Sequence, residues 1–116
     1  MEKKRANMKE YTRQQKYKIT RLKKLYPDLE GIEQCFDPAF SPNLMERLVY
    51  DLKGGLDISK YANPLIFTND QIVELSLAAA MKDDHILTFL AHPEYSADTM
   101  RYMRNYLRLM KLIRLI

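Results

Sequence analysis

The chain has 116 residues, of which 47% are hydrophobic, with one cysteine and a net charge of +4. This length supports one small domain, and this hydrophobic fraction is typical of a folded protein rather than a disordered one. A single cysteine excludes a framework of internal disulfides and favours a reducing compartment, so we expect a cytoplasmic protein. No window approaches 18 uncharged apolar residues, and the sequence therefore predicts no membrane-spanning helix.

The charges are distributed unevenly along the chain. Residues 1–25 carry a net charge of +8, residues 26–98 carry −9 and residues 99–116 carry +5. Blocks of this kind indicate that the basic ends bind an anionic partner, or that they attract the acidic middle.

The first expected element is a basic helix over roughly residues 2–25, which Pro27 ends. An apolar stripe at helical spacing runs along it with a gap at Gln15, and it consists of Met8, Tyr11, Ile19, Leu22 and Tyr26. Its cations surround the helix rather than marking one face. Tyr11 and Tyr17 lie among these cations and could stack on bases. Residues 28–36 are expected to form a connector with one turn of helix.

A proline, an aromatic residue and a small hydroxyl residue then recur in this order three times. The copies are D-P-A-F-S-P at residues 37–42, N-P-L-I-F-T at residues 63–68 and H-P-E-Y-S at residues 92–96. Their hydroxyl residues, Ser41, Thr68 and Ser96, are separated by 27 and 28 residues. This near-constant spacing indicates an internal repeat.

Each copy has the chemistry of a helix start. The proline holds the preceding residue extended, and the hydroxyl can accept hydrogen bonds from the first free N–H groups of a helix. Thr68 and Gln71 also have the spacing of a capping box. The aromatic residue pairs with an apolar residue five positions later, which is the spacing of a hydrophobic staple; the pairs are Phe40 with Met45, Phe67 with Ile72 and Tyr95 with Met100.

The helices that follow these starts are predicted from apolar faces of period 3.6. The first is expected to end at Gly54-Gly55, the second near Asp83-Asp84 and the third at the C-terminus, with short helical turns over residues 56–61 and 85–90. The sequence therefore predicts an all-α domain. A basic N-terminal helix (residues 1–27) would precede a core (residues 28–116) of three helix-turn units of about 27 residues, packed in sequence like a truncated solenoid.

Residues 37–64 resemble a short repeat of proteins carried by bacterial conjugative transposons and phages. The shared pattern is P-x-F-S-x-x-x-M followed by G-L-D-[IV]-S-x-Y-A-x-P, and the similarity is weaker beyond residue 64. The matching residues are Asp37, Pro38, Phe40, Met45, Leu52, Gly55, Leu56, Asp57, Ile58, Ser59, Tyr61 and Ala62. The family's Q-M-x-E-I-R is L-M-E-R-L-V in this chain, so its charge pattern is not kept. The resemblance implies no catalytic residues. It implies the setting of mobile DNA, where small proteins such as anti-CRISPR proteins often block host defences by binding them.

Few residues of this chain are suited to catalysis or metal binding. Cys35 stands in no Cys–His or G-x-S-x-G signature, and a semi-buried apolar role is expected for it. His85 and His92 do not have zinc spacing, and His92 occupies a turn position of the repeat. Gly54-Gly55 is not followed by the G-K-[ST] of a phosphate-binding loop. The sequence therefore predicts no enzyme activity, no metal and no other cofactor.

One set of residues is predicted to bind an anionic partner, either nucleic acid or an acidic protein surface. Four of its members recur at helical spacing in the last helix and form a row roughly 15 Å long, which could follow several phosphates. The acidic middle argues against a protein that coats duplex DNA. The predicted set is Lys16, Arg21, Lys23, Lys24, Arg101, Arg104, Arg108 and Lys111.

A second set is predicted to form a protein interface. The segment Leu107–Ile116 is apolar on more than one helix face, and dimerisation or a partner would cover the excess. The segment could also lie on a membrane surface. The predicted interface residues are Tyr102, Tyr106, Leu109 and Ile113.

Three functions stay open at this point. The leading one is a non-catalytic binding protein of a phage or mobile element, which docks onto a host protein or nucleoprotein as an inhibitor of the anti-CRISPR kind. The alternative is a nucleic-acid-binding accessory protein that uses the basic first and last helices. A membrane-surface role is a third, weaker hypothesis.

Overall fold

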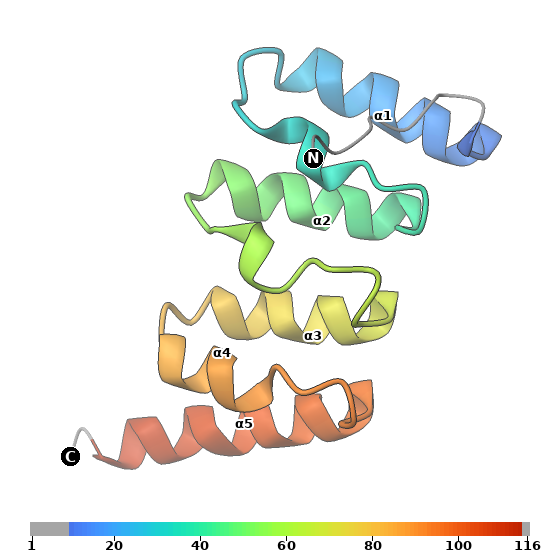
Figure 1. The fold of residues 1–116 in the computed structure, drawn as a ribbon. Coiled ribbons are helices and arrows are strands. Elements are labelled where there is room, and N and C mark those ends of the chain that lie inside the picture. Colours follow the sequence, from blue (N-terminus) through green and yellow to red (C-terminus); the bar gives the residue numbers. More distant parts are fainter. Residues whose placement is uncertain (1–9, 115–116) are drawn as a thin grey trace, which may run out of the picture. The chain divides into compact units, whose positions relative to one another are not determined.

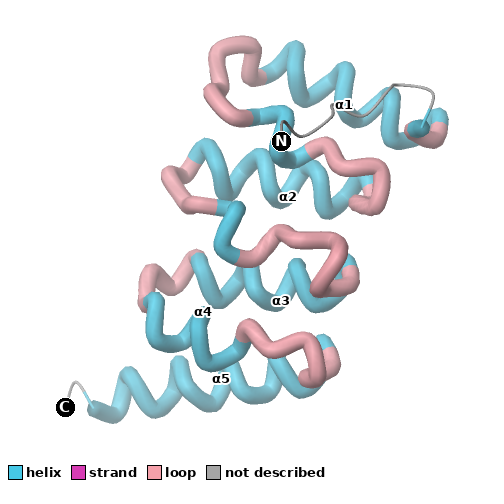
Figure 2. The backbone as a smooth tube through the Cα atoms, viewed as in Figure 1, coloured by secondary structure: helices cyan, strands magenta, loops and turns pink. Residues whose placement is uncertain are grey.

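The computed structural model describes residues 10–114, and all regular secondary structure in this range is helical (Figure 1). Five α-helices and two short 3-10 helices alternate with loops, and no strand occurs among the described residues (Figure 2). The predicted all-α fold is therefore confirmed for this part of the chain.

The chain divides into two compact units, Met1–Ser59 and Lys60–Ile116. The first contains α1 (Arg13–Leu25), the 3-10 helix η2 (Ile32–Cys35) and α2 (Pro42–Lys53), with η3 (Ile58–Lys60) at the boundary. The second contains α3 (Asn69–Ala79), α4 (Asp84–Leu90) and α5 (Ala97–Arg114). Within the first unit α1 and η2 pack against α2, and within the second the three helices pack against one another (Figure 1).

Helix α1 begins at Arg13, so the predicted helix is not continuous across residues 10–12. Thr12 Oγ1 accepts a hydrogen bond from the backbone N–H of Gln15 at 3.1 Å, and Gln15 Oε1 accepts one from the N–H of Thr12 at 2.8 Å. This is a reciprocal capping box, which places residues 10–12 before the helix. Residues 2–9 of the predicted helix lie outside the described part of the chain. Gln15 interrupts the apolar stripe because its side chain is part of the cap of α1.

The three predicted helix starts are confirmed by their caps. The hydroxyl oxygens of Ser41, Thr68 and Ser96 each accept a hydrogen bond from the N–H three residues later, at 3.1, 3.2 and 3.1 Å. The apolar residues predicted to pair with the aromatic residues are fully buried; they are Met45, Ile72 and Met100. Thr12 makes a fourth start of the same kind.

The predicted end of α2 is also confirmed. Gly55 has a φ of +89°, which glycine adopts without strain, and its N–H donates to Leu52 O at 3.0 Å. The N–H of Leu56 donates to Asp51 O at 3.0 Å, which completes a Schellman motif. The end predicted for α3, near Asp83-Asp84, is wrong.

Helix α3 ends at Ala79, about four residues earlier than predicted. A turn follows in which Lys82 has a φ of +56°, the only non-glycine positive φ among the described residues. Asp83 then caps α4, because its side chain accepts hydrogen bonds from the N–H groups of His85 and Ile86. The two aspartates therefore begin a helix rather than ending one.

A buried glutamine joins two helix starts within each unit. In the first unit, Gln15 Nε2 donates to Pro38 O at 2.9 Å and to Phe40 O at 2.7 Å. In the second unit, Gln71 Nε2 donates to Pro93 O at 3.0 Å and to Tyr95 O at 2.6 Å. Both glutamines are buried, and they are 56 positions apart. The two units therefore share one construction.

This contact uses every hydrogen-bonding group of the glutamine amide. The oxygen closes the capping box of its own helix, and the two N–H groups hold the carbonyls that precede the next cap. Because buried carbonyls without partners are costly, the side chain fixes where the following loop lies. The helix starts are thereby grouped in pairs, Thr12 with Ser41 and Thr68 with Ser96.

We expect Gln15→Glu to lower the free energy of unfolding by about 2–4 kcal/mol. A glutamate keeps the acceptor of the capping box, but it removes both donors and places its oxygens against two carbonyls. Urea denaturation measures the effect. Gln14→Glu is the matched control, because Gln14 is the exposed neighbour on the same helix and should change stability by less than about 0.5 kcal/mol. Equal effects of the two variants would contradict the assigned role.

Candidate binding surfaces

Two cations of α1 form ion pairs within the first unit. Lys18 Nζ contacts the Glu46 carboxylate, and Lys23 Nζ lies 3.0 Å from Glu33 Oε1. Lys23 Nζ also lies 5.8 Å from the centre of the Phe36 ring. The hydrogen bond from Lys18 lowers the pKa of Glu46 from its usual value. The charges of these two lysines are therefore already engaged by acids of the same unit.

The other cations of α1 lie exposed, and none of them makes an ion pair with a described residue. They are Arg13, Lys16, Arg21 and Lys24. Tyr17 lies among them with 70% of its surface exposed. Tyr11 has a different role, because its hydroxyl donates a hydrogen bond to Phe36 O, and it is not free to stack on bases. Within α1, Tyr17 is therefore the aromatic side chain available to a ligand.

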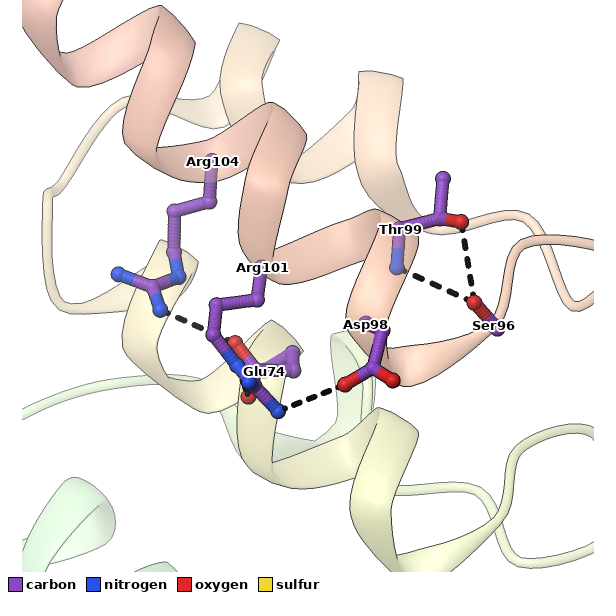
Figure 3. Close-up of polar contacts among 6 residues, drawn as sticks. All are labelled: Glu74, Ser96, Asp98, Thr99, Arg101 and Arg104. Carbon is purple, nitrogen blue, oxygen red and sulfur yellow. Dashed lines mark hydrogen bonds and ion pairs between the residues drawn. The ribbon is translucent and has the colours of Figure 1, made fainter.

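The basic row of α5 is largely engaged by acids of the second unit. Arg101 Nε lies 3.3 Å from Glu74 Oε2, and Arg104 Nη2 lies 3.0 Å from Glu74 Oε1 (Figure 3). Arg101 also contacts Asp98 at 3.0 Å (Figure 3). Glu74 is buried, with 8% of its side chain exposed, so the two arginines neutralise a carboxylate inside the unit.

The remaining two members of this row differ from each other. Lys111 Nζ lies 3.2 Å from Asp83 Oδ2, and this hydrogen bond lowers the pKa of Asp83 from its usual value. Arg108 is exposed and makes no ion pair with a described residue. Of the four predicted phosphate contacts on α5, Arg108 is therefore the one that no acid within residues 10–114 engages.

The two units contain equivalent ion pairs of opposite polarity. Lys18 and Glu74 each stand six residues after the threonine cap of their helix. Glu46 and Arg101 each stand five residues after the serine cap of theirs. The first unit thus pairs a lysine on its first helix with a glutamate on its second, and the second unit reverses the signs.

The predicted protein interface is exposed along one side of α5. At 100° per residue, its four members fall on one face of the helix, opposite the buried Met100. Their exposed fractions are large for apolar side chains. The values are 78% for Tyr102, 50% for Tyr106, 58% for Leu109 and 53% for Ile113. We call these four residues the α5 stripe.

A groove that was not predicted from the sequence lies between α4 and α5, next to this stripe. It encloses about 400 Å³, and its lining includes Ile86, Phe89, Leu107 and Met110. Phe89 is about half exposed, which is unusual for a phenylalanine in a folded unit. The signal in the sequence was an aromatic residue on the polar side of H-I-L-T-F-L, which the prediction of a short helical turn did not use.

The residues considered for chemistry have structural contacts. Cys35 is fully buried, and burial raises the pKa of its thiol to about 12. His92 Nδ1 lies 4.0 Å from Glu94, and its ring packs edge-on against Tyr95. Asp84 lies 3.7 Å from Lys60. Within residues 10–114, no three side chains of His, Cys, Asp or Glu converge as metal ligands would.

No protein-family model, curated protein or solved structure was found to match this chain. Among the helices of the described residues, none combines the length and apolar character that crossing a bilayer requires.

We expect Glu74→Gln to destabilise the protein by about 3 kcal/mol, because it leaves the nearly buried Arg104 without its carboxylate. Glu46→Gln should cost about 1 kcal/mol or less, because the Glu46 side chain is one-third exposed and its ion pair is accordingly weaker. Urea denaturation of both variants at neutral pH gives the comparison. Equal losses of unfolding free energy in the two variants would contradict a larger contribution from the buried ion pairs of Glu74.

Alkylation by iodoacetamide should be slow at Cys35 in the folded protein and fast in urea. The thiol is buried and its raised pKa keeps it protonated at neutral pH, whereas the thiolate is the reactive form. Mass spectrometry of samples quenched over time measures the rate. Rapid labelling of the folded protein would contradict this assignment.

Proposed function

We propose that this chain is a non-catalytic binding protein of a phage or other mobile element, which docks onto a host protein or nucleoprotein and inhibits a defence complex. The α5 stripe is the observation that carries the docking. The resemblance of residues 37–64 supports the mobile-element origin, and with it a cytoplasmic site of action. The buried, protonated Cys35 supports a role without covalent catalysis.

The spacing of the stripe favours an α-helix as the partner element. Its members are separated by 4, 3 and 4 residues, which is the alternation of the a and d positions of a heptad. The row extends over roughly 16 Å, or about three helical turns. A helix with a matching apolar seam could pack along it with side chains interdigitated.

The groove beside the stripe adds a site where a side chain of the partner can be anchored. Met110 lines the groove and lies on α5 next to the stripe, so apolar surface continues from one to the other. An apolar side chain of the partner that entered the groove would contact Phe89 and Leu107. Buried anchors of this kind contribute most of the binding energy in many interfaces.

The finer prediction about the fold, three units of about 27 residues packed in sequence, remains a proposal. It is supported by the capped starts at Ser41, Thr68 and Ser96. The fourth start at Thr12 and the two glutamine contacts support a longer period as well, in which two helix starts form one repeat of about 56 residues.

The second candidate function is that of a nucleic-acid-binding accessory protein. The observation that favours it is the set of exposed cations around Tyr17 on α1, which make no ion pair with the residues that the structure describes. The engaged arginines of α5 do not favour it, because Glu74 and Asp98 already neutralise them.

A plaque assay tests the leading proposal. The protein is expressed in bacterial strains that each carry one CRISPR–Cas system directed against an infecting phage. Wild-type protein should restore plaque formation in at least one strain, and the double variant Leu109→Asp, Ile113→Asp should lose this effect. Leu65→Asp is the matched control, because Leu65 is a 93% exposed apolar residue of the same unit, outside α5.

The outcomes separate the parts of the proposal. Failure of the wild type in every strain would refute inhibition of CRISPR defence, and full activity of the double variant would refute docking through α5. Light scattering of the purified protein tests whether a second copy of the chain, rather than a host protein, covers the α5 stripe. A dimer that the double variant converts to monomers would assign the α5 stripe to a second copy of this chain.

A further inference from the structure

We infer that the exposed face of α1 binds single-stranded nucleic acid, with Tyr17 stacking on a base and with Arg13, Arg21 and Lys24 contacting phosphates. This inference rests on the second candidate function and specifies its site and its ligand. It does not depend on docking through the α5 stripe. We call these four residues the α1 face.

The helix geometry places the α1 face opposite the buried side of α1. At 100° per residue, its four residues fall within a sector of about 80°. The buried residues Gln15, Ile19 and Leu22 lie on the opposite side of the helix. The face extends from the first turn to the last over roughly 16 Å, which is long enough for a strand to run along it.

The ion pairs of the unit separate the cations of α1 by role. Lys18 and Lys23 stand toward the acids of the first unit, and their charges are neutralised at contact distance. The cations of the α1 face make no ion pair with a described residue, although Arg21 is near enough to Glu46 to help lower its pKa after the larger effect of Lys18. An external anion therefore meets cations whose charge is not already neutralised.

Tyr17 gives this surface a feature that a solvated basic helix does not need. It is 70% exposed, and Arg13 and Arg21 stand one helical turn before it and one after it. An exposed aromatic ring between cations is the arrangement that binds single strands, because the ring stacks on a base while the cations hold the backbone. A duplex keeps its base faces stacked inside and cannot use the ring in this way.

The overall charge distribution also favours a single strand over a duplex. Residues 26–98 carry a net charge of −9, which repels an extended array of phosphates. A flexible strand can follow the α1 face alone. The chemistry of the face does not distinguish DNA from RNA, so both are included in the test.

Fluorescence anisotropy with the full chain provides the test. The probes are labelled 12-mers of thymidylate and of uridylate, with a hairpin duplex of matched length. We expect at least one single strand to bind at about 50 mM salt, and to bind about 20-fold more weakly at about 200 mM, as three phosphate contacts predict. The duplex should bind more weakly than the single strand.

Two pairs of variants distinguish base stacking on Tyr17 and phosphate contacts of the α1 face from nonspecific attraction between a basic protein and a nucleic acid. Tyr17→Ala should weaken binding about tenfold, whereas Tyr17→Phe keeps the ring and the affinity. Lys24→Ala should weaken binding severalfold and reduce the salt slope by about 0.7. Lys23→Ala is its matched control, since it removes the same charge from the neighbouring residue, which pairs with Glu33, and should leave binding unchanged.

Several outcomes would overturn the inference. These are no binding of either 12-mer at low salt, equal losses for Lys23→Ala and Lys24→Ala, and a Tyr17→Ala variant that binds like the wild type. Competition by polyglutamate as strong as that by the unlabelled strand would assign the face to an acidic protein. The α5 double variant should bind the strand normally, so failure of this inference and failure of docking through α5 are distinguishable.

Discussion

The fold of each unit depends on one buried amide. A glutamine at the third position of a helix closes the cap of that helix and holds the loop that begins the next one. Local capping and tertiary packing are usually separate constraints, but here one side chain supplies both. Its two N–H groups hold both carbonyls that precede the next cap, and this fixes where the second helix starts. The apolar residues at the staple positions, Met45, Ile72 and Met100, are fully buried in the same units.

Ion pairs inside each unit decide which cations are left to contact a partner. In both units, charges near the helix contact are neutralised internally, and this removes Lys18, Arg101 and Arg104 from the set of available cations. Among the described residues, the α1 face and the α5 stripe are both exposed, and they have different chemistry. One is basic with an exposed ring on α1, and the other is apolar on α5.

Local signals in the sequence predicted the helices well. Proline, aromatic and hydroxyl residues marked three starts, and Gly54-Gly55 marked one end, because each of these acts through its own backbone. The start at Thr12 was missed because no proline precedes it and because Gln15 interrupts an otherwise apolar stripe. The ion pairs of Arg101 and Arg104 could not be predicted, since Glu74 is 27 and 30 positions away and no local pattern relates them. For the same reason, the spacing of the cations in the sequence could not show which of them form ion pairs with distant acids.

The reversed polarity of the two ion pairs has a consequence for assembly of the chain. Two units built alike offer each helix a wrong partner of nearly the right shape, which is a known hazard of tandem repeats. If α1 took α5 in place of α2, Lys18 would meet Arg101. If α3 took α2, Glu74 would meet Glu46. Each exchange would bring like charges together, so the reversed polarity of the two ion pairs disfavours both of these wrong pairings.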